Sequence, residues 1–235
     1  PGTMTAVLCD VNKAQEILDK ADTRIIIANH NSPSQIVLSG PVPDMETVEA
    51  VLKNEKIKFR RLPVSAAFHS SLMTEACAPF LSHLKGFDLK EPSVPIYSNI
   101  SGKPHQNKPD SIREALTKQI VNPVQFVKEI EEMHAAGVRT FIEVGAGCVL
   151  TNCVAKILED RPHSAINMDT KNEHGITSLW KALAKLLIAG VTPDFSYLWK
   201  DYEPVSDPRK KEKPKFSVTL SGTNYGKTVS ALLAE

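Results

Sequence analysis

The stretch RIIIANHNSPSQIVLSGP, from Arg24 to Pro41, decides the fold of the first third of the chain. It contains two runs that are rich in Ile, Val and Leu, and the segment NHNSPS lies between them. Asn, Ser and Pro favour turns, whereas β-branched residues favour strands. The stretch therefore predicts a β-hairpin.

Regular elements are predicted on both sides of this hairpin. MTAVLC predicts a short strand, and VNKAQEILDKA predicts a helix capped by Asp10, because its apolar residues recur on one helical face. After the hairpin, Asp44 is predicted to cap a second helix, and IKFRRLPVS is predicted to form the last strand. The order β-α-β-β-α-β is that of the ferredoxin-like fold. We assign it to a small subdomain over residues 1–64.

After Ser65 the pattern changes to helices and strands that alternate along the chain. Helices are predicted at residues 72–84, 111–121, 124–137, 149–160 and 176–190, and strands at residues 94–101, 139–147 and 163–169. The strand at residues 139–147 is predicted to be buried. This alternation predicts a parallel sheet with helices on its faces. We assign residues 65–191 to a larger α/β subdomain, and we expect residues 192–235 to form an extended tail.

Composition restricts the possible function classes. The 235 residues include 28 Lys and Arg against 27 Asp and Glu, and a net charge of +1 gives no reason to expect nucleic-acid binding. No run approaches the ~20 apolar residues of a membrane helix, and no signal peptide is visible. Four cysteines lie in no CxxC pair, which is typical of free thiols in a reducing compartment. We expect a cytoplasmic protein without membrane or nucleic-acid partners.

Complete catalytic motifs are missing from the sequence. It contains no GxSxG elbow, phosphate-binding loop or HExxH motif, and GAGC, from Gly145, predicts a tight strand-to-helix turn. Seven histidines have no pair at helical ligand spacing, so no metal site is predicted.

His69, in the stretch LPVSAAFHSSLM, is the one histidine with a suggestive position. It lies at the boundary between the two predicted subdomains, where clefts usually form, and small residues flank it. A histidine can take a proton from a serine hydroxyl at neutral pH, but a structural histidine is the alternative.

Five stretches in order carry a resemblance to a known family. VSAAFHSSLM resembles the histidine motif of acyltransferase domains in polyketide and polyunsaturated fatty acid synthases, and of the malonyl-CoA:acyl carrier protein transacylases. The stretches NHNSPSQIVLSG, VPIYSNISG, KQIVNPVQF and FIEVGAGCVLT resemble further landmarks of that family. The resemblance covers about Pro1 to Asp201. In the tail, FSVTLSGTNYG resembles the segment that follows the transferase in large synthases.

The resemblance implies a fold and a mechanism. The fold is an α/β-hydrolase-like large subdomain with a ferredoxin-like small subdomain inserted, and the active site lies between them. Malonyl-CoA acylates a serine on a GHSxGE elbow, and the acyl group then moves to the phosphopantetheine thiol of an acyl carrier protein. No bound cofactor is implied, and neighbouring synthase domains are expected partners.

The resemblance also assigns roles to individual residues. His69 would be the catalytic base, Gln119 would orient its imidazole through a backbone carbonyl, and Asn122 would lie nearby as support. Asn29 or Asn31 would line the arm of the cofactor. Phe68 resembles the malonyl-type pattern, in which a ring fills the space that an α-methyl group would need. Ala66 departs from that pattern, because a histidine is common at its position.

The nucleophile of the implied dyad is not found in the sequence. In the family, the elbow serine, the oxyanion-hole segment and the arginine that holds the malonyl carboxylate all precede the region that matches here. We expect the serine on a missing N-terminal segment or on a second chain, and the present chain alone to be inactive. Two alternatives stay open: a non-catalytic docking fragment of a multidomain synthase, and a thioesterase-like hydrolase that shares the histidine.

Overall fold

The structure is a computed structural model that describes residues 2–200. The chain divides into two units, residues 1–192 and 193–235, and the described part of the second unit contains only the 3₁₀ turn η2, Ser196–Trp199. Most of the predicted tail, including FSVTLSGTNYG, lies outside the described residues. The predicted boundary between subdomains at residue 64 falls inside the first unit and stays a prediction.

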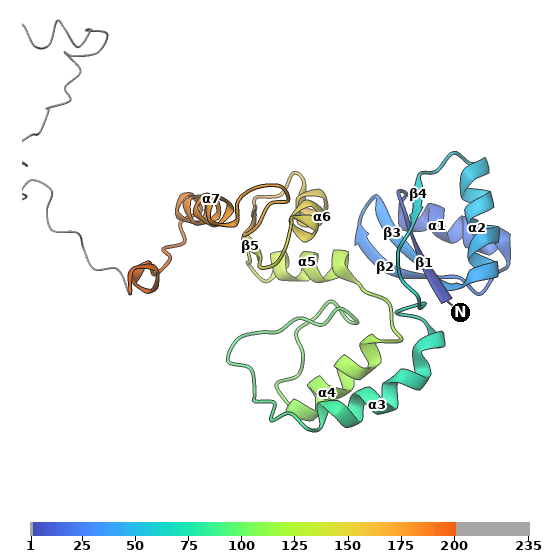
Figure 1. Ribbon diagram of the computed structural model, residues 1–235, viewed down its shortest axis with the longest axis horizontal. Coiled ribbons are helices and arrows are strands. Elements are labelled where there is room, and N and C mark those ends of the chain that lie inside the picture. The colour runs from blue at the N-terminus through green and yellow to red at the C-terminus, as the bar shows by residue number, and fades with distance from the viewer. Residues whose placement is uncertain (1, 201–235) are drawn as a thin grey trace, which may run out of the picture. The chain divides into compact units, whose positions relative to one another are not determined.

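The first part of the chain forms a four-stranded antiparallel sheet with two helices (Figure 1). Its elements are β1 Gly2–Val7, α1 Val11–Ala21, β2 Ile26–Ser32, β3 Gln35–Pro41, α2 Val42–Asn54 and β4 Phe59–Arg61. The strand order is β2-β3-β1-β4. The predicted β-α-β-β-α-β unit and its hairpin are therefore confirmed.

Helices α1 and α2 cover one face of this sheet because each has an apolar face. The core between them and the sheet consists of Val7, Ala14, Ile17, Leu18, Ile25, Ile36, Leu38, Met45, Val48 and Leu52. As predicted, Asp10 caps α1, and its carboxylate accepts a hydrogen bond of 2.9 Å from the Lys13 backbone N–H.

Asp44 does not cap α2, contrary to the prediction. The helix begins at Val42, two residues earlier, with Pro41 at the N-cap position. Pro43 lies in the first helical turn, and the φ that its ring imposes is already helical. The helix can therefore start before Asp44. The Asp44 carboxylate instead accepts bonds of 3.0 Å from both the backbone N–H and the Nε of Arg24. The guanidinium beside it lowers the pKa of the Asp44 carboxyl.

The second part of the chain contains most of the helices. Its elements are η1 Ser71–Met73, α3 Thr74–Leu84, α4 Pro109–Gln119, α5 Phe126–Ala135, β5 Thr140–Glu143, α6 Val149–Leu158, β6 Ser164–Asn167 and α7 Gly175–Ile188. Strands β5 and β6 pair in parallel, and α6 connects them. A small core of Val127, Ile130, Val154, Ile157 and Leu158 joins α5 to α6.

The strand predicted at residues 94–101 is not formed. The segment turns back on itself instead, with Gly102 in the left-handed region, and only an isolated bridge joins Tyr97 to Pro104. The Ser98 N–H donates to the Lys103 carbonyl at 2.9 Å within this turn. Strand structure requires the backbone of a neighbouring strand, and in the part of the chain described here this segment has no partner strand; outside its own turn, the Asn99 carbonyl accepts from the Gln125 N–H at 2.7 Å.

The linker between α4 and α5 lies along the free edge of β2. Val124 donates to the Ala28 carbonyl at 2.8 Å and accepts from the His30 N–H at 3.0 Å. Met4, Ala28 and Val37 of the same sheet form a second apolar cluster, separate from the core under α1 and α2. The small sheet is therefore joined by backbone hydrogen bonds to the residues that follow α4.

Strand β5 is more exposed than its apolar sequence predicts. Ile142 is 44% exposed and Val144, directly after the strand, is 85% exposed. Within residues 2–200, β5 pairs only with β6, so its other edge has no partner strand. A parallel strand is normally buried between neighbours and helices, and this explains why the prediction of a buried strand was wrong.

Two further observations concern the sequence predictions about compartment. All four cysteines are free, but only Cys153 is buried, and burial raises the pKa of the Cys9 and Cys153 thiols. Among the described helices, none has the length and apolar character needed to cross a lipid bilayer.

The exposed apolar edge of β5 leads to a prediction about association. An unpaired strand edge is a template for pairing with another chain, so the isolated chain should self-associate as its concentration rises. Ile142→Lys places a charge on β5 and should shift the distribution toward monomer. Sedimentation velocity at several concentrations measures this change.

Val94→Lys is the matched control, because Val94 is an exposed apolar residue outside any strand. It should leave the distribution as in the unmodified chain. A chain that stays monomeric at every concentration and unfolds in one cooperative transition would contradict the prediction.

Candidate active site

His69 lies in a tight turn between β4 and η1. Its backbone has φ = 61°, in the left-handed region. For a residue with a side chain this conformation costs roughly 1–2 kcal/mol, and it persists only where the surroundings hold it. The turn passes close over the sheet, because a Cβ added to Gly2 would lie 2.6 Å from Ala67 Cβ.

The end of α4 holds His69 from one side. The His69 N–H donates to the Ile120 carbonyl at 2.9 Å, and the imidazole Nδ1 lies 2.9 Å from the Gln119 carbonyl oxygen. The last carbonyls of a helix have no partner within the helix, and His69 satisfies two of those at the end of α4. Because a carbonyl oxygen can only accept, Nδ1 is the nitrogen that carries the proton in the neutral ring, and Nε2 keeps its lone pair.

Two serine hydroxyls hold the backbone of the same turn. Ser39, fully buried in β3, donates from Oγ to the Phe68 carbonyl at 2.7 Å. Ser70 donates from Oγ to the Ala67 carbonyl at 2.6 Å, and the same oxygen accepts from the Leu72 N–H at 3.3 Å. The first bond comes from the small sheet, whereas the second is local to the turn.

Gln119 reaches His69 only through its backbone. Its side-chain Nε2 donates to the Asn122 carbonyl at 3.2 Å, and the Asn122 side chain donates to the Lys118 carbonyl at 2.7 Å. Both amides therefore fix the turn that ends α4. The structure places the Gln119 carbonyl against the His69 imidazole and the Asn122 carbonyl against the Gln119 side chain, whereas the Asn122 side chain is bonded within this turn.

The remaining predicted residues lie around this group. Asn29 pairs with Val124 across the edge of β2, and its Oδ1 is buried without a hydrogen-bond partner among the described residues. Asn31 lies two residues further along β2, is half-buried, and makes no hydrogen bond with His69 or Gln119 in the described part of the chain. Phe68 is 41% exposed beside His69.

A hollow of about 490 Å³ borders the histidine turn. It is lined by Gly2, Arg24, Pro41, Pro43, Ser65, Ala66, Ala67, Leu72 and Met73. The small side chains of Ala66 and Ala67 leave this space open. His69 itself does not line this hollow, and neither does any other predicted site residue.

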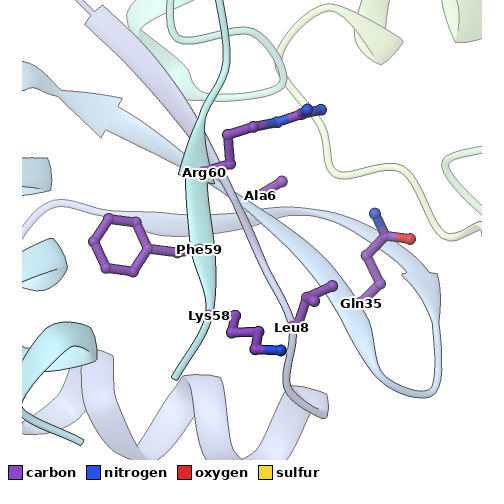
Figure 2. A pocket seen from close by; sticks show the side chains of 6 residues that line it. All are labelled: Ala6, Leu8, Gln35, Lys58, Phe59 and Arg60. Carbon is purple, nitrogen blue, oxygen red and sulfur yellow. The ribbon is translucent and has the colours of Figure 1, made fainter. Parts of the chain in front are cut away.

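A second hollow, of about 220 Å³, lies on the sheet away from the histidine turn. Figure 2 shows the side chains that surround it, with Leu8, Gln35 and Lys58 together and the Phe59 ring on the opposite side of β4. None of the predicted site residues lines this hollow. Its cations, Lys58 and Arg60, give it a positive rim.

The GAGC segment is a structural turn, as predicted. Glu143 at the end of β5 accepts bonds from the backbone N–H groups of Leu150 and Thr151, at 3.1 and 2.8 Å, and so caps α6. Burial acts to raise the pKa of Glu143, but hydrogen bonds from Thr151 and Leu150 outweigh it, and the pKa is lowered. In the described residues, no cluster of three His, Cys, Asp or Glu side chains could hold a metal ion.

Two residues of the site were missed by the sequence reasoning. Ser39 is a polar residue in an otherwise apolar run, QIVLSG, and this was an available signal. Gly2 carries no local signal, because only its close approach to Ala67, 65 residues away in sequence, requires a glycine.

Comparisons with known proteins place the chain in a family. Residues 1–191 match the family described as the acyl transferase domain. The chain is 37% identical over 162 residues to the malonyl CoA-acyl carrier protein transacylase of Bacillus subtilis, covering 66% of this chain and 50% of that protein. It is 29% identical over 229 residues to one polypeptide of the polyunsaturated fatty acid synthase of Thraustochytrium, covering 95% of this chain and 8% of that protein.

A solved structure extends the comparison to the fold. The acyltransferase domain from the second module of the salinomycin polyketide synthase superposes with a TM-score of 0.75 at 28% identity, covering 88% of this chain and 49% of that one. The predicted fold class, an α/β-hydrolase-like acyltransferase domain with a ferredoxin-like subdomain, is confirmed. The chain spans half or less of the length of these three proteins.

The contact between Gly2 and Ala67 gives a prediction about stability. In Gly2→Ala the added methyl would overlap Ala67, so either β1 or the histidine turn must move. Overpacking of this kind typically costs about 1–3 kcal/mol in the free energy of unfolding, and urea denaturation measures it. Gly145→Ala is the control, because no atom lies within 4 Å of the added methyl there. Equal stability of the two variants would refute the close packing of the turn.

Proposed function

Because the chain belongs to the acyl transferase domain family, we propose that it forms the histidine-bearing part of an acyltransferase. The reaction loads malonyl from malonyl-CoA onto the phosphopantetheine thiol of an acyl carrier protein, in polyketide or fatty acid synthesis. The observation that carries the proposal is the contact between His69 Nδ1 and the Gln119 carbonyl, which favours the tautomer with an unprotonated Nε2.

In the proposed reaction His69 acts as the base for a serine that another segment supplies. The serine hydroxyl proton passes to Nε2 while Oγ bonds to the thioester carbon of malonyl-CoA. The tetrahedral intermediate then expels the coenzyme A thiolate, which takes the proton from the imidazolium. The phosphopantetheine thiol attacks the acyl-serine in the second half of the reaction, and His69 takes the thiol proton and returns it to the serine.

The Gln119 carbonyl has two effects in this scheme. It fixes the tautomer that leaves Nε2 free, and its negative dipole stabilises the positive charge that develops on the ring. A carboxylate often has this role in other serine enzymes. Here Gln119 supplies a backbone carbonyl, which no side-chain substitution at that position removes.

The substrate contacts of the proposal rest on fewer observations. Phe68 lies beside His69 and is partly exposed. We propose that its ring packs against the α-carbon of the bound acyl group. Asn29 or Asn31 is assigned to the cofactor arm, and the buried Asn29 Oδ1, which has no partner among the described residues, favours Asn29. Asn122 is assigned a supporting role near His69. The acyl carrier protein and neighbouring synthase domains are the proposed partners.

A non-catalytic docking fragment is the second candidate. The exposed edge of β5 favours it, because such an edge suits a scaffold as well as an incomplete sheet. The two candidates differ in labelling by malonyl-CoA. Neither hypothesis predicts labelling of this chain alone. After a serine-bearing segment is added, only the enzyme hypothesis predicts labelling.

The role of His69 predicts a large effect on rate. We call this chain together with the serine-bearing segment the complete domain. In the complete domain, His69→Ala should lower malonyl transfer about 10²–10⁴-fold, since general-base catalysis typically contributes that much. Binding of the carrier protein should be unchanged. Rapid-quench measurement of malonyl transfer tests the rate, and titration with the apo carrier protein tests binding.

His174→Ala is a suitable control because His174 is exposed at the start of α7. This variant should transfer malonyl at the normal rate. If His69→Ala also kept a near-normal rate, His69 would be a structural histidine and the proposal would fail.

The position of Phe68 predicts the selectivity between extender units. Its ring should exclude a branching methyl group by overlap, and discrimination by one methyl is limited to roughly 1–3 kcal/mol, or 10–200-fold. The complete domain should prefer malonyl-CoA over methylmalonyl-CoA within that range. Phe68→Ser should narrow the gap, mainly by improving the branched substrate. Competition between the two thioesters, read by mass on the carrier protein, measures the ratio.

Leu116→Ser changes an apolar residue of similar exposure on α4 and serves as the comparison; it should leave the ratio unchanged. A ratio that Phe68→Ser leaves unchanged would place the selectivity determinant outside this chain.

A further inference from the structure

We propose that Ser39 is a positioning residue for His69. The inference rests on the proposed function, because it gives the histidine a catalytic task, but the geometry behind it is independent of the reaction. Ser39 is not in the histidine motif and lies 30 residues before it in the sequence. Its hydroxyl acts on the backbone of the turn and not on the substrate.

One peptide group is held at both of its polar atoms. The Phe68 carbonyl and the His69 N–H belong to the same planar peptide unit. Its oxygen accepts from Ser39 Oγ at 2.7 Å, and its N–H donates to the Ile120 carbonyl at 2.9 Å. The small sheet and the end of α4 therefore hold this peptide plane from its two sides.

This double attachment explains how the strained backbone of His69 persists. A left-handed residue relaxes when the preceding peptide plane rotates, and that rotation would turn the Phe68 carbonyl away from Ser39. It would also displace the imidazole from the Gln119 carbonyl, because the ring follows the backbone at Cα. The Ser39 hydroxyl opposes this rotation from inside the sheet.

Burial makes the Ser39 hydrogen bond more effective. Ser39 has no exposed surface, so water cannot replace its hydroxyl. Removing it leaves the Phe68 carbonyl without that partner in a part-buried site, which is more costly than losing a bond at the surface. We therefore expect Ser39→Ala to weaken the orientation of His69 while leaving the apolar core in place.

The test reads the imidazole directly in the chain labelled with ¹⁵N at histidine, at alkaline pH. In the unmodified chain His69 should give one tautomer, with a protonated Nδ1 and an unprotonated Nε2. In Ser39→Ala the two ¹⁵N shifts should move toward each other, because both tautomers become populated. Ser39→Cys keeps the shape but donates a weaker bond, and it should resemble Ser39→Ala.

Ser32→Ala is the matched control. Ser32 is equally buried in the same sheet, and its Oγ has no hydrogen-bond partner among the described residues. It should keep the single tautomer. Identical ¹⁵N shifts in folded Ser39→Ala and in the unmodified chain would overturn the proposal. Unfolding of both Ser39 variants, with Ser32→Ala folded, would assign the hydroxyl to folding and overturn it as well.

Kinetics of the complete domain separate this inference from the proposed function. Ser39→Ala should lower kcat roughly 5- to 100-fold, the range expected from one buried hydrogen bond, with KM for malonyl-CoA unchanged. A tautomer change in a domain that transfers no acyl group would support the positioning role and refute the proposed reaction. An unchanged His69 tautomer in a Ser39→Ala domain that transfers malonyl normally would refute the positioning role and leave the proposed reaction supported.

Discussion

The arrangement of the site depends on the two carbonyl groups that α4 leaves unpaired at its end. The Gln119 carbonyl contacts the imidazole of His69, and the Ile120 carbonyl accepts from its backbone N–H. The last carbonyls of a helix need donors from outside the helix. The same two hydrogen bonds therefore stabilise the end of α4 and orient the histidine. The tautomer of the ring, and with it the availability of Nε2, follows from that geometry.

The small sheet matters to this site because it supplies the surface on which the histidine turn rests. Gly2 admits the turn close to β1, Ser39 binds its backbone, and Val124 joins the residues after α4 to the edge of β2. The histidine therefore depends on elements from the start and from the middle of the region that matches the family. Changes in the sheet far from any substrate should be felt at the imidazole.

The sequence predicted the small sheet well because its determinants are local: a turn-rich segment between apolar runs, and Asp10 before an amphipathic helix. It predicted a strand at residues 94–101 wrongly, since a strand depends on a partner that local sequence does not contain. His69 and Gln119 were found through a family motif. The contact of Ser39 with Phe68 joins residues 29 apart, and no local pattern indicates it. The catalytic roles themselves stay proposals.

The central claim is that this chain contributes the base, and another segment the nucleophile, of one acyltransferase site. The most direct measurement is covalent labelling by radioactive malonyl-CoA of a separately produced serine-bearing segment from an acyltransferase domain, with and without this chain. The account predicts acyl-serine only when both polypeptides are present, together with its transfer to a carrier protein. Labelling to the same extent without this chain, or none when both are folded and associated, would contradict it.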